Sequence, residues 1–205
     1  SEYCAEGKVC IDTGYGMYTV NYPVGSESNP VVFNEMENTV EQTGTTYYQT
    51  YSDGMIMTIT GTDYTLTIGG ETITPENGVY TTVISLVDYQ PTVFAITGEG
   101  TFTVNFTYPL GAAENPAALV MGENKAEVAE GSWGYYYTWT ATEAGILTIS
   151  MPEALGWTYT INNITAGTYG DNQWSDSDPV VNPATVEVAA GDQLQIIVNT
   201  YDPAD

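Results

Sequence analysis

Hydrophobic and polar residues alternate with a period of two along much of this chain. The segments 64–68 and 101–106 both alternate between a large apolar residue and a polar one, which is threonine everywhere except at Asn105. This puts the apolar side chains on one face of an extended strand. Turn residues such as Gly69-Gly70 and Asn77-Gly78 separate such segments at intervals of about ten residues, as in β-sandwich domains. The pattern predicts an all-β fold of half-buried strands whose threonines face outward.

The same pattern occurs twice. The string Tyr-Pro-Val-Gly-Ser-Glu-Ser-Asn-Pro at 22–30 returns as Tyr-Pro-Leu-Gly-Ala-Ala-Glu-Asn-Pro at 108–116. The segments 47–51 and 135–139 align next, and further pairs follow in the same order. A collinear repeat of this kind indicates two copies of one structural unit. We therefore predict two tandem β-sandwich domains, Ig-like or jelly-roll-like, related by an internal repeat.

A recurring end motif sets the boundaries. Val-Asn followed by Tyr and Pro occurs at 20–23, 104–109 and 198–203. We place the first copy at 22–107 and the second at 108–205. Residues 1–21 precede both copies, and their motif is interpreted as the last strand of an upstream unit or as a strand borrowed by the first copy.

Composition supports a packed β core and restricts the partners. Hydrophobic residues make up 42% of the chain and aromatic residues 12%, and its wealth of Thr, Tyr, Val and Ile favours strands. There are 26 Asp and Glu residues against Lys8 and Lys125, so the formal net charge is −24. Phosphate backbones and anionic lipid heads need Lys or Arg to neutralise them. We expect no nucleic-acid partner and no membrane insertion, and instead neutral ligands, cations or other proteins.

The two cysteines, Cys4 and Cys10, lie close together. They predict a small disulfide loop formed in an oxidising compartment, with a free thiol pair as the alternative. Two cysteines without histidine fall short of a tetrahedral zinc site. We expect a secreted or cell-surface, extracellular protein.

Catalysis is the less favoured function class. The chain has no histidine, which removes the usual Ser–His and Cys–His pairs. A glycosidase needs only two suitably spaced carboxylates, which so many acidic residues can supply by accident. Small sandwich domains seldom hold a complete active cleft, however, so we expect binding without catalysis.

All four tryptophans lie in the second copy. Trp139 and Trp157 align with tyrosines of the first copy on alternating strands, so we assign both to the core. Trp133 and Trp174 lie in polar stretches without alternating apolar partners, which predicts exposed loop positions. The run 171–178 around Trp174 aligns with 79–87 of the first copy, a segment that we predict to be a strand.

An exposed tryptophan flanked by Asp, Asn and Gln suits a neutral sugar. The ring face stacks on the C–H face of a pyranose, while amides and carboxylates bind its hydroxyls. The alternative is a tryptophan folded back over the end of the sandwich. The predicted carbohydrate-binding residues are Trp133, Trp174, Tyr135, Tyr169, Asp171, Asn172, Gln173 and Asp176.

The same acidic run has a second interpretation. Ca²⁺ takes about six to eight oxygen ligands from Asp-rich loops, and Asp171, Asp176 and Asp178 would be the ligands here. We expect no other cofactor. Outside this run, the alignment of 123–130 with 38–42 predicts a further strand.

Three strings resemble repeats of large surface proteins of gut bacteria: 137–145, 159–163 and 191–203. More narrowly, the tandem arrangement resembles the starch-binding modules of starch-adherence (amylosome) proteins, which are non-catalytic β-sandwich pairs that hold α-glucans. The resemblance covers nearly the whole chain. It implies binding of starch or malto-oligosaccharides through aromatic residues in a surface groove.

The first copy departs from this pattern because it has no tryptophan. Its candidates for exposed rings are Tyr47, Tyr48 and Tyr89, most of which we expect to pack in the core. We therefore expect a non-catalytic, α-glucan-binding module of a bacterial surface protein, which binds mainly through the second copy and works beside other modules of that protein or complex. The alternative is a structural spacer or adhesin domain without its own ligand.

Overall fold

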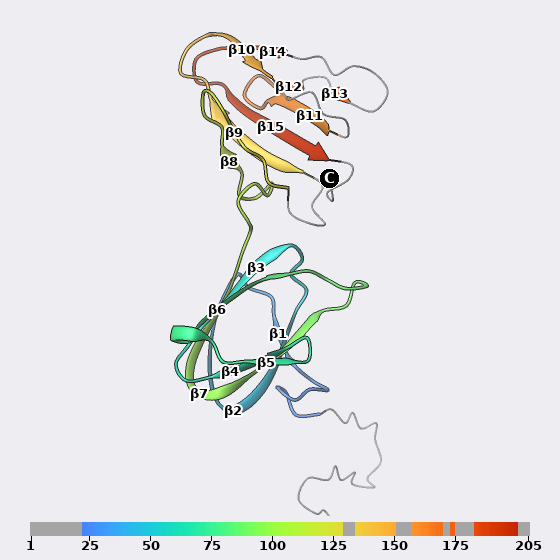
Figure 1. Cartoon of the computed structure of the whole chain (residues 1–205), viewed down its shortest axis with the longest axis vertical. Helices are drawn as coiled ribbons and strands as arrows, with labels where there is room; N and C mark the ends of the chain where they lie inside the picture. Colours follow the sequence, from blue (N-terminus) through green and yellow to red (C-terminus); the bar gives the residue numbers. More distant parts are fainter. Residues whose placement is uncertain (1–21, 129–133, 151–156, 170–172, 175–182, 201–205) are drawn as a thin grey trace, which may run out of the picture. The chain divides into compact units, whose positions relative to one another are not determined.

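A computed structural model of the chain describes residues 22–128, 134–150, 157–169, 173–174 and 183–200 (Figure 1). The predicted Cys4–Cys10 loop and the rest of segment 1–21 lie outside these residues. Within them the regular structure is β-strand, apart from the short 3-10 helix η1 (Glu76–Gly78), and no α-helix occurs. The predicted all-β class is therefore confirmed. The chain divides into two compact units, called unit 1 and unit 2, whose main boundary falls between Phe106 and Thr107.

Unit 1 contains a seven-stranded sheet. Its central path runs β1-β2-β7-β3-β6, and β4 pairs with both β5 and β7. The strands are β1 (Val31–Phe33), β2 (Glu37–Thr50), β3 (Met55–Thr60), β4 (Thr65–Ile68), β5 (Glu71–Ile73), β6 (Val79–Ile84) and β7 (Thr92–Thr107).

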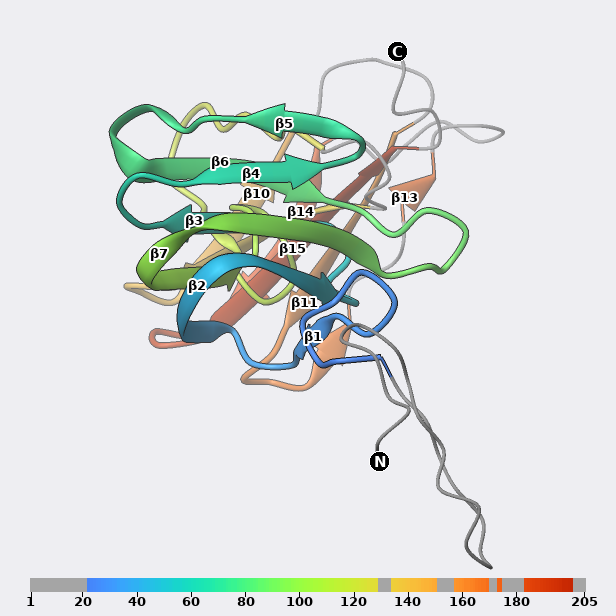
Figure 2. The same cartoon turned by 90° about the horizontal axis from the view of Figure 1, so that it is seen from below.

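Two long strands, β2 and β7, hold unit 1 together. They pair antiparallel from Glu37 opposite Asn105 to Thr50 opposite Thr92, and they curve side by side in Figure 2. Midway along the pair Gly44 lies opposite Gly98, where the missing side chains let both strands bend.

The two halves of β7 have different neighbours. On the edge that β2 leaves open, β4 pairs with Phe94–Thr97 in the first half of β7. The partner β3 therefore belongs to the second half, and Gly61, directly after β3, lies against the Phe102 ring. The second half of β7 thus runs between β2 and β3.

The period-two pattern predicted the core of unit 1. Phe102 and Val104 are 0% exposed and Phe106 is 3% exposed, while Thr103 and Asn105 between them lie nearer the surface. The same holds for Tyr64 and Leu66 of the β4 region. Burial of such side chains contributes about 1.5–3 kcal/mol each.

Unit 2 contains two sheets. The larger has the order β12-β11-β15-β9-β8, with β13 also on β11, and the smaller is the pair β10-β14. The strands are β8 (Ala117–Ala118), β9 (Tyr135–Thr140), β10 (Gly145–Ile149), β11 (Trp157–Asn163), β12 (Thr168–Tyr169), β13 (Gln173–Trp174), β14 (Ala184–Val188) and β15 (Gln193–Thr200).

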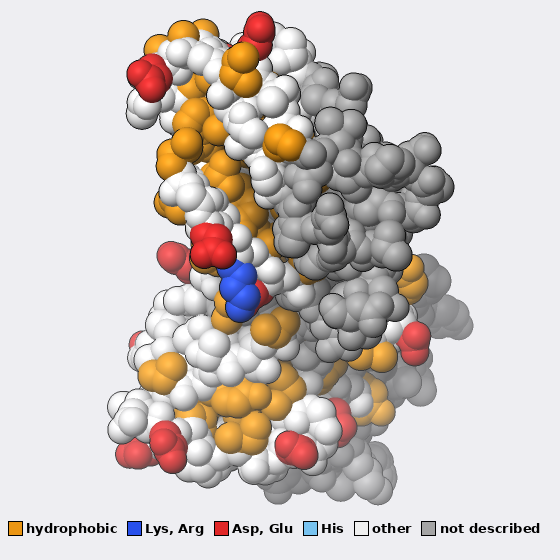
Figure 3. Space-filling view, turned by 45° about the horizontal axis from the view of Figure 1, so that its top comes forward, with side chains coloured by type: hydrophobic (Ala, Val, Ile, Leu, Met, Phe, Trp, Pro, Cys, Tyr) orange, Lys and Arg blue, Asp and Glu red, His pale blue; other side chains and the backbone are white. Residues whose placement is uncertain are grey.

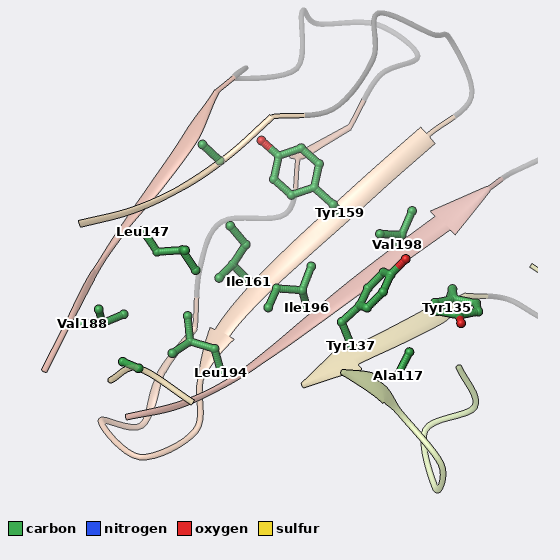
Figure 4. Close-up of a cluster of buried hydrophobic side chains, with 12 residues drawn as sticks. Ala117, Tyr135, Tyr137, Leu147, Tyr159, Ile161, Val188, Leu194, Ile196 and Val198 are labelled. Atoms are coloured by element: carbon green, nitrogen blue, oxygen red, sulfur yellow. The ribbon is translucent and has the colours of Figure 1, made fainter. Parts of the chain in front are cut away.

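The core of unit 2 lies between these two sheets (Figure 4). Leu147 of β10 and Val188 of β14 face the apolar side chains of β11 and β15, among them Ile161 and Ile196. Trp139 is partly buried and packs against this cluster, in agreement with its predicted core position. The side chain of Trp157 lies outside the described part of the chain.

Each unit begins with the same turn. In unit 1 the Gly25 amide donates to the Asn29 carbonyl at 2.8 Å, and in unit 2 the Gly111 amide donates to the Asn115 carbonyl at 2.8 Å. Both glycines have positive φ, +88° and +91°, a conformation that favours glycine. A Cβ on Gly111 would lie 2.2 Å from the Tyr135 ring. The two strings that align in the sequence therefore adopt one local structure.

Strand pairing shifts the predicted alignment by one residue. Tyr48 pairs with Phe94 of β7, and Tyr137 pairs with Ile196 of β15. Both tyrosines also pair in parallel with the short first strand of their unit, β1 or β8. Tyr48 thus corresponds to Tyr137 rather than to Tyr136. A shift of one residue exchanges the two faces of a strand, and Tyr48 and Tyr137 are indeed both buried.

The strand register also gives the end motif different positions in the two units. Ile96 pairs with Thr46, which lies two residues before Tyr48, and Val198 pairs with Tyr135, which lies two residues before Tyr137. Val198 therefore corresponds to Ile96 and not to Val104.

Two further expectations are corrected. Strand β14 pairs with β10 as β6 pairs with β3, so 79–84 corresponds to β14 rather than to the run 171–178. In the predicted strand 123–130, residues 123–128 form no strand, and 129–130 lie outside the described residues.

Candidate functional site

Three of the predicted sugar-binding residues lie along the edge of β11. Strand β12 pairs Tyr169 with Asn162, and β13 pairs Gln173 with Tyr159 and Trp174 with Thr158. Gln173 and Trp174 therefore form a short edge strand, where the sequence predicted a loop. We call the backbone positions Tyr169, Gln173 and Trp174 the β11 edge.

The remaining predicted residues of this site lie outside the described part of the chain. They are Trp133, Asp171, Asn172 and Asp176, together with Asp178 of the predicted calcium site. Among the residues that the structure does describe, no three Asp, Glu, His or Cys side chains are grouped to hold a metal ion. The calcium interpretation stays a prediction.

Tyr135 does not belong to an exposed platform. Its side chain is 9% exposed and is part of the core cluster of unit 2. Its ring centroid lies 5.0 Å from that of Tyr137, and Gly111 covers another part of the ring. Tyr135 was a candidate because it lies close to Trp133 in the sequence, but the turn at Gly111 packs over its ring.

The three tyrosine candidates of unit 1 have different environments. Tyr48 is 2% exposed and stacks on Phe33 at a centroid distance of 4.9 Å. Tyr47 is half-buried. Tyr89 is 92% exposed, and its φ is +59°, which is uncommon for an aromatic residue. Tyr89 is thus the candidate ring of unit 1 that is free to meet a ligand.

The Asp192 carboxylate holds the end of β11 by hydrogen bonds. It accepts hydrogen bonds from the Asn163 side-chain amide at 2.7 Å and from the Ala189 amide at 2.9 Å. These bonds, the one from Ala189 first, lower the pKa of Asp192. The Asn163 side-chain oxygen accepts from the Ala166 amide at 3.0 Å, so the network fixes the turn between β11 and β12.

The sequence reasoning missed a groove in unit 2. It has a volume of about 520 Å³ and lies beside β10. The segment 119–126 forms one wall, the β10 end 147–150 forms another, and Tyr137, Ile196 and Val198 also line it. The sequence carried no signal for this groove, because the alignment of 123–130 with 38–42 predicted a strand along the wall that 123–126 forms without strand structure.

The groove holds a buried hydroxyl without a partner. Tyr137 is 5% exposed and lines the groove, and its hydroxyl has no hydrogen-bond partner among the described residues. Burial, and secondarily the neighbouring Tyr135, raise the pKa of Tyr137. In unit 1 the corresponding Tyr48 hydroxyl donates to the Gln42 side-chain oxygen. A buried hydroxyl without a partner costs about 1–3 kcal/mol.

Charge is nearly absent from the groove. Glu123 and Lys125 are the charged residues in its lining. Lys125 is ion-paired with Glu127, and this hydrogen bond raises the pKa of Lys125 and lowers that of Glu127. Figure 3 shows the basic side chain of the described residues, in blue, beside acidic side chains in red. Because both partners of the pair are exposed, it contributes little stability.

Comparison with known proteins finds no family model and no curated protein that matches this chain. No described element is a helix with the length and apolar character that a membrane crossing needs.

Proposed function

We propose that this chain is a non-catalytic carbohydrate-binding module that holds α-glucan at the β11 edge of unit 2. The observation that carries the proposal is the register of β12 and β13. This register brings the backbone positions Tyr169, Gln173 and Trp174 to the same edge of β11. An indole, a phenol and an amide along one edge supply both the stacking faces and the hydrogen bonds that a sugar chain requires.

The charge of the molecule supports a neutral ligand. A formal net charge of −24 repels acidic polysaccharides and favours uncharged polymers such as starch. Secretion or display on a cell surface, beside other modules of one protein or complex, belongs to the same proposal, because a bacterium meets the starch polymer outside its own cell.

We also propose that both units are β-sandwich copies of one domain. The shared initial turn supports this, as does the shared pairing of a short first strand, a second strand and a last strand in each unit. The β3-β6 and β10-β14 pairs extend the correspondence to the other side of each unit.

Affinity electrophoresis in gels with and without starch tests the binding proposal. We expect starch to retard the chain, and Trp174→Ala to lose at least most of that retardation because a stacked ring is removed. The matched control is Tyr89→Ala, which removes an exposed ring from unit 1 and is expected to leave the retardation unchanged.

Each other outcome has a defined meaning. Migration of the wild-type chain at the same rate in both gels would remove the glucan proposal and leave the spacer or adhesin role. Retardation that Tyr89→Ala abolishes and Trp174→Ala preserves would assign binding to unit 1 and overturn the β11 edge as the site.

A further inference from the structure

The groove of unit 2 corresponds to a filled space in unit 1. There, the second half of β7 lies between β2 and β3, and its side chains Phe102, Val104 and Phe106 are at most 3% exposed. Unit 1 thus completes its core with an aromatic strand segment. We call this segment, 100–106, the closing strand.

Unit 2 has no closing strand among its described residues. Strand β10 corresponds to β3, because each pairs with the later strand β14 or β6. On its other edge β3 pairs with β7, whereas β10 has β14 as its sole partner in the described part of the chain. Strand β15, which corresponds to the first half of β7, is described only to Thr200. The edge of β10 that is free of a partner in the described residues, and the groove beside it, occupy the place of the closing strand.

The unpaired hydroxyl of Tyr137 is a second sign of the same gap. In unit 1 the corresponding Tyr48 hydroxyl is satisfied by Gln42 of β2, next to the closing strand. Gln42 lies six positions before Tyr48. The residue six positions before Tyr137 is Gly131, which has no side chain to accept the bond. The groove lining therefore includes one buried hydroxyl that has no hydrogen-bond partner among the described residues.

One segment of the chain matches the closing strand. The closing strand reads Gly-Thr-Phe-Thr-Val-Asn-Phe, and residues 16–22 read Gly-Met-Tyr-Thr-Val-Asn-Tyr. Gly, Thr, Val and Asn are identical, and both aromatic positions are kept. Residues 201–205, Tyr-Asp-Pro-Ala-Asp, lack the alternation and contain a proline, which cannot donate to a strand ladder.

The order of motifs indicates which unit such a segment completes. The closing strand of unit 1 leads directly into Tyr108-Pro109, the first turn of unit 2. In this chain a closing strand is thus followed by the first turn of the next unit, and it completes the unit before that turn. Segment 16–21 precedes Tyr22-Pro23, the first turn of unit 1, so by the same order it is not the closing strand of unit 1.

We propose that segment 16–21 of one copy of this chain docks in the groove of unit 2 of a second copy and pairs with the free edge of β10. Tyr18 and Val20 then take the places of Phe102 and Val104, and point into the core. Addition of a strand to a free edge supplies backbone hydrogen bonds and side-chain pockets together. Because the two contact surfaces differ, the association is head-to-tail and extends to further copies.

Charge fits this occupant. Residues 14–22 contain no charged side chain, and the groove lining contains one acid and one base. Two chains of net charge −24 repel each other elsewhere, so a contact between copies has to use such uncharged surfaces. The association is expected to strengthen as salt screens the repulsion, with a Debye length of about 8 Å at about 0.15 M.

Sedimentation velocity over a hundredfold range of protein concentration tests the proposal. We expect the average mass of the full chain to rise with concentration, and the Tyr18→Asp/Val20→Asp variant to associate at least tenfold more weakly. The matched control is Met17→Asp/Thr19→Asp, which adds the same charge to the opposite face of the strand and is expected to keep most of the association.

A second pair of variants tests the groove side on β10. Ile149 lines the groove, whereas Ile146 is 67% exposed and does not line it. We expect Ile149→Asp to weaken the association and Ile146→Asp to leave it largely unchanged, with circular dichroism showing that both variants fold. A peptide of residues 14–22 is expected to compete with the association.

Three results would overturn the proposal. The first is a mass that stays at one chain over the whole concentration range. The second is equal weakening by the two variant pairs of segment 16–21. The third is association that folded Ile149→Asp and Ile146→Asp keep to the same degree.

Discussion

At the scale of single residues, a buried tyrosine hydroxyl links two neighbouring strands of unit 1. Tyr64 is 3% exposed, and its hydroxyl donates to the Ile59 carbonyl at 3.1 Å. Burial raises the pKa of Tyr64 to about 12. Its hydroxyl therefore links β3 to the start of β4 only while it stays protonated.

This shift predicts a loss of stability at alkaline pH. The unfolded state loses the Tyr64 proton near its ordinary pKa of about 10, whereas the folded state keeps it to about 12. The contribution is thus fully present below pH 10 and is lost as the pH rises from 10 towards 12. We expect Tyr64→Phe to lose less stability than the wild type over this interval.

Urea unfolding followed by circular dichroism measures this difference. Near neutral pH, Tyr64→Phe is expected to be less stable by about 1 kcal/mol because one hydrogen bond is lost. The gap between the variant and the wild type should then narrow above pH 10. A gap that stays constant to the highest pH would contradict a raised pKa for Tyr64.

At the scale of elements, strands β2 and β9 differ in how far they extend. β2 runs for 14 residues and carries Gln42, the partner of the Tyr48 hydroxyl, in its first half. β9 has six residues and begins at Tyr135, so it supplies no such partner to Tyr137. The hydroxyl at this tyrosine position therefore stabilises unit 1, where it has a hydrogen-bond partner, and destabilises unit 2, where it has none among the described residues.

The matched substitutions Tyr48→Phe and Tyr137→Phe test this difference. We expect Tyr48→Phe to destabilise unit 1 by about 1 kcal/mol, because Gln42 loses its donor. Tyr137→Phe removes a buried hydroxyl without a partner and is expected to stabilise unit 2 by about 1 kcal/mol. Tryptophan fluorescence follows unit 2 in urea, since all four tryptophans lie there. Destabilisation by Tyr137→Phe in dilute solution would show that its hydroxyl has a partner.

At the scale of the whole molecule, the two units begin with the same turn but differ in which strand edges are left unpaired in the described residues. Unit 1 closes its core with β7, whereas unit 2 leaves the β10 edge and the groove open in its described residues. The short strands on the β11 edge are likewise a feature of unit 2. Both proposed binding surfaces therefore belong to unit 2.

Ligand-linked unfolding tests that asymmetry. A malto-oligosaccharide at a hundred times its dissociation constant is expected to stabilise unit 2 by about 2.7 kcal/mol, because it binds the folded state alone. The tryptophan-detected transition should move to higher urea concentration. Unit 1, followed by the remaining dichroism change, should unfold as before. Equal shifts of both transitions, or no shift, would contradict binding by unit 2.

Much of the fold and little of the site could be predicted from the sequence. Period-two alternation identified the buried faces at Phe102 and Val104 because burial itself selects that pattern. The cluster 135–137 has three consecutive tyrosines, so Tyr47 and Tyr48 align with tyrosines in two registers, and the register that the sequence favours aligns Tyr48 with Tyr136 instead of Tyr137. Tyr135 was misplaced because its burial depends on Gly111, which lies far from it in the sequence.

By itself, the amino-acid sequence determined the all-β class, the identical turns after Tyr22 and Tyr108, and the charge that disfavours anionic partners. These properties are local or additive, since they depend on neighbouring residues or on a sum of charges. Only the tertiary structure decided that Val198 corresponds to Ile96, that the β10 edge is unpaired in the described residues, and that Tyr137 lines a groove. These depend on which strands meet across the core, and such pairing is set by packing between distant segments.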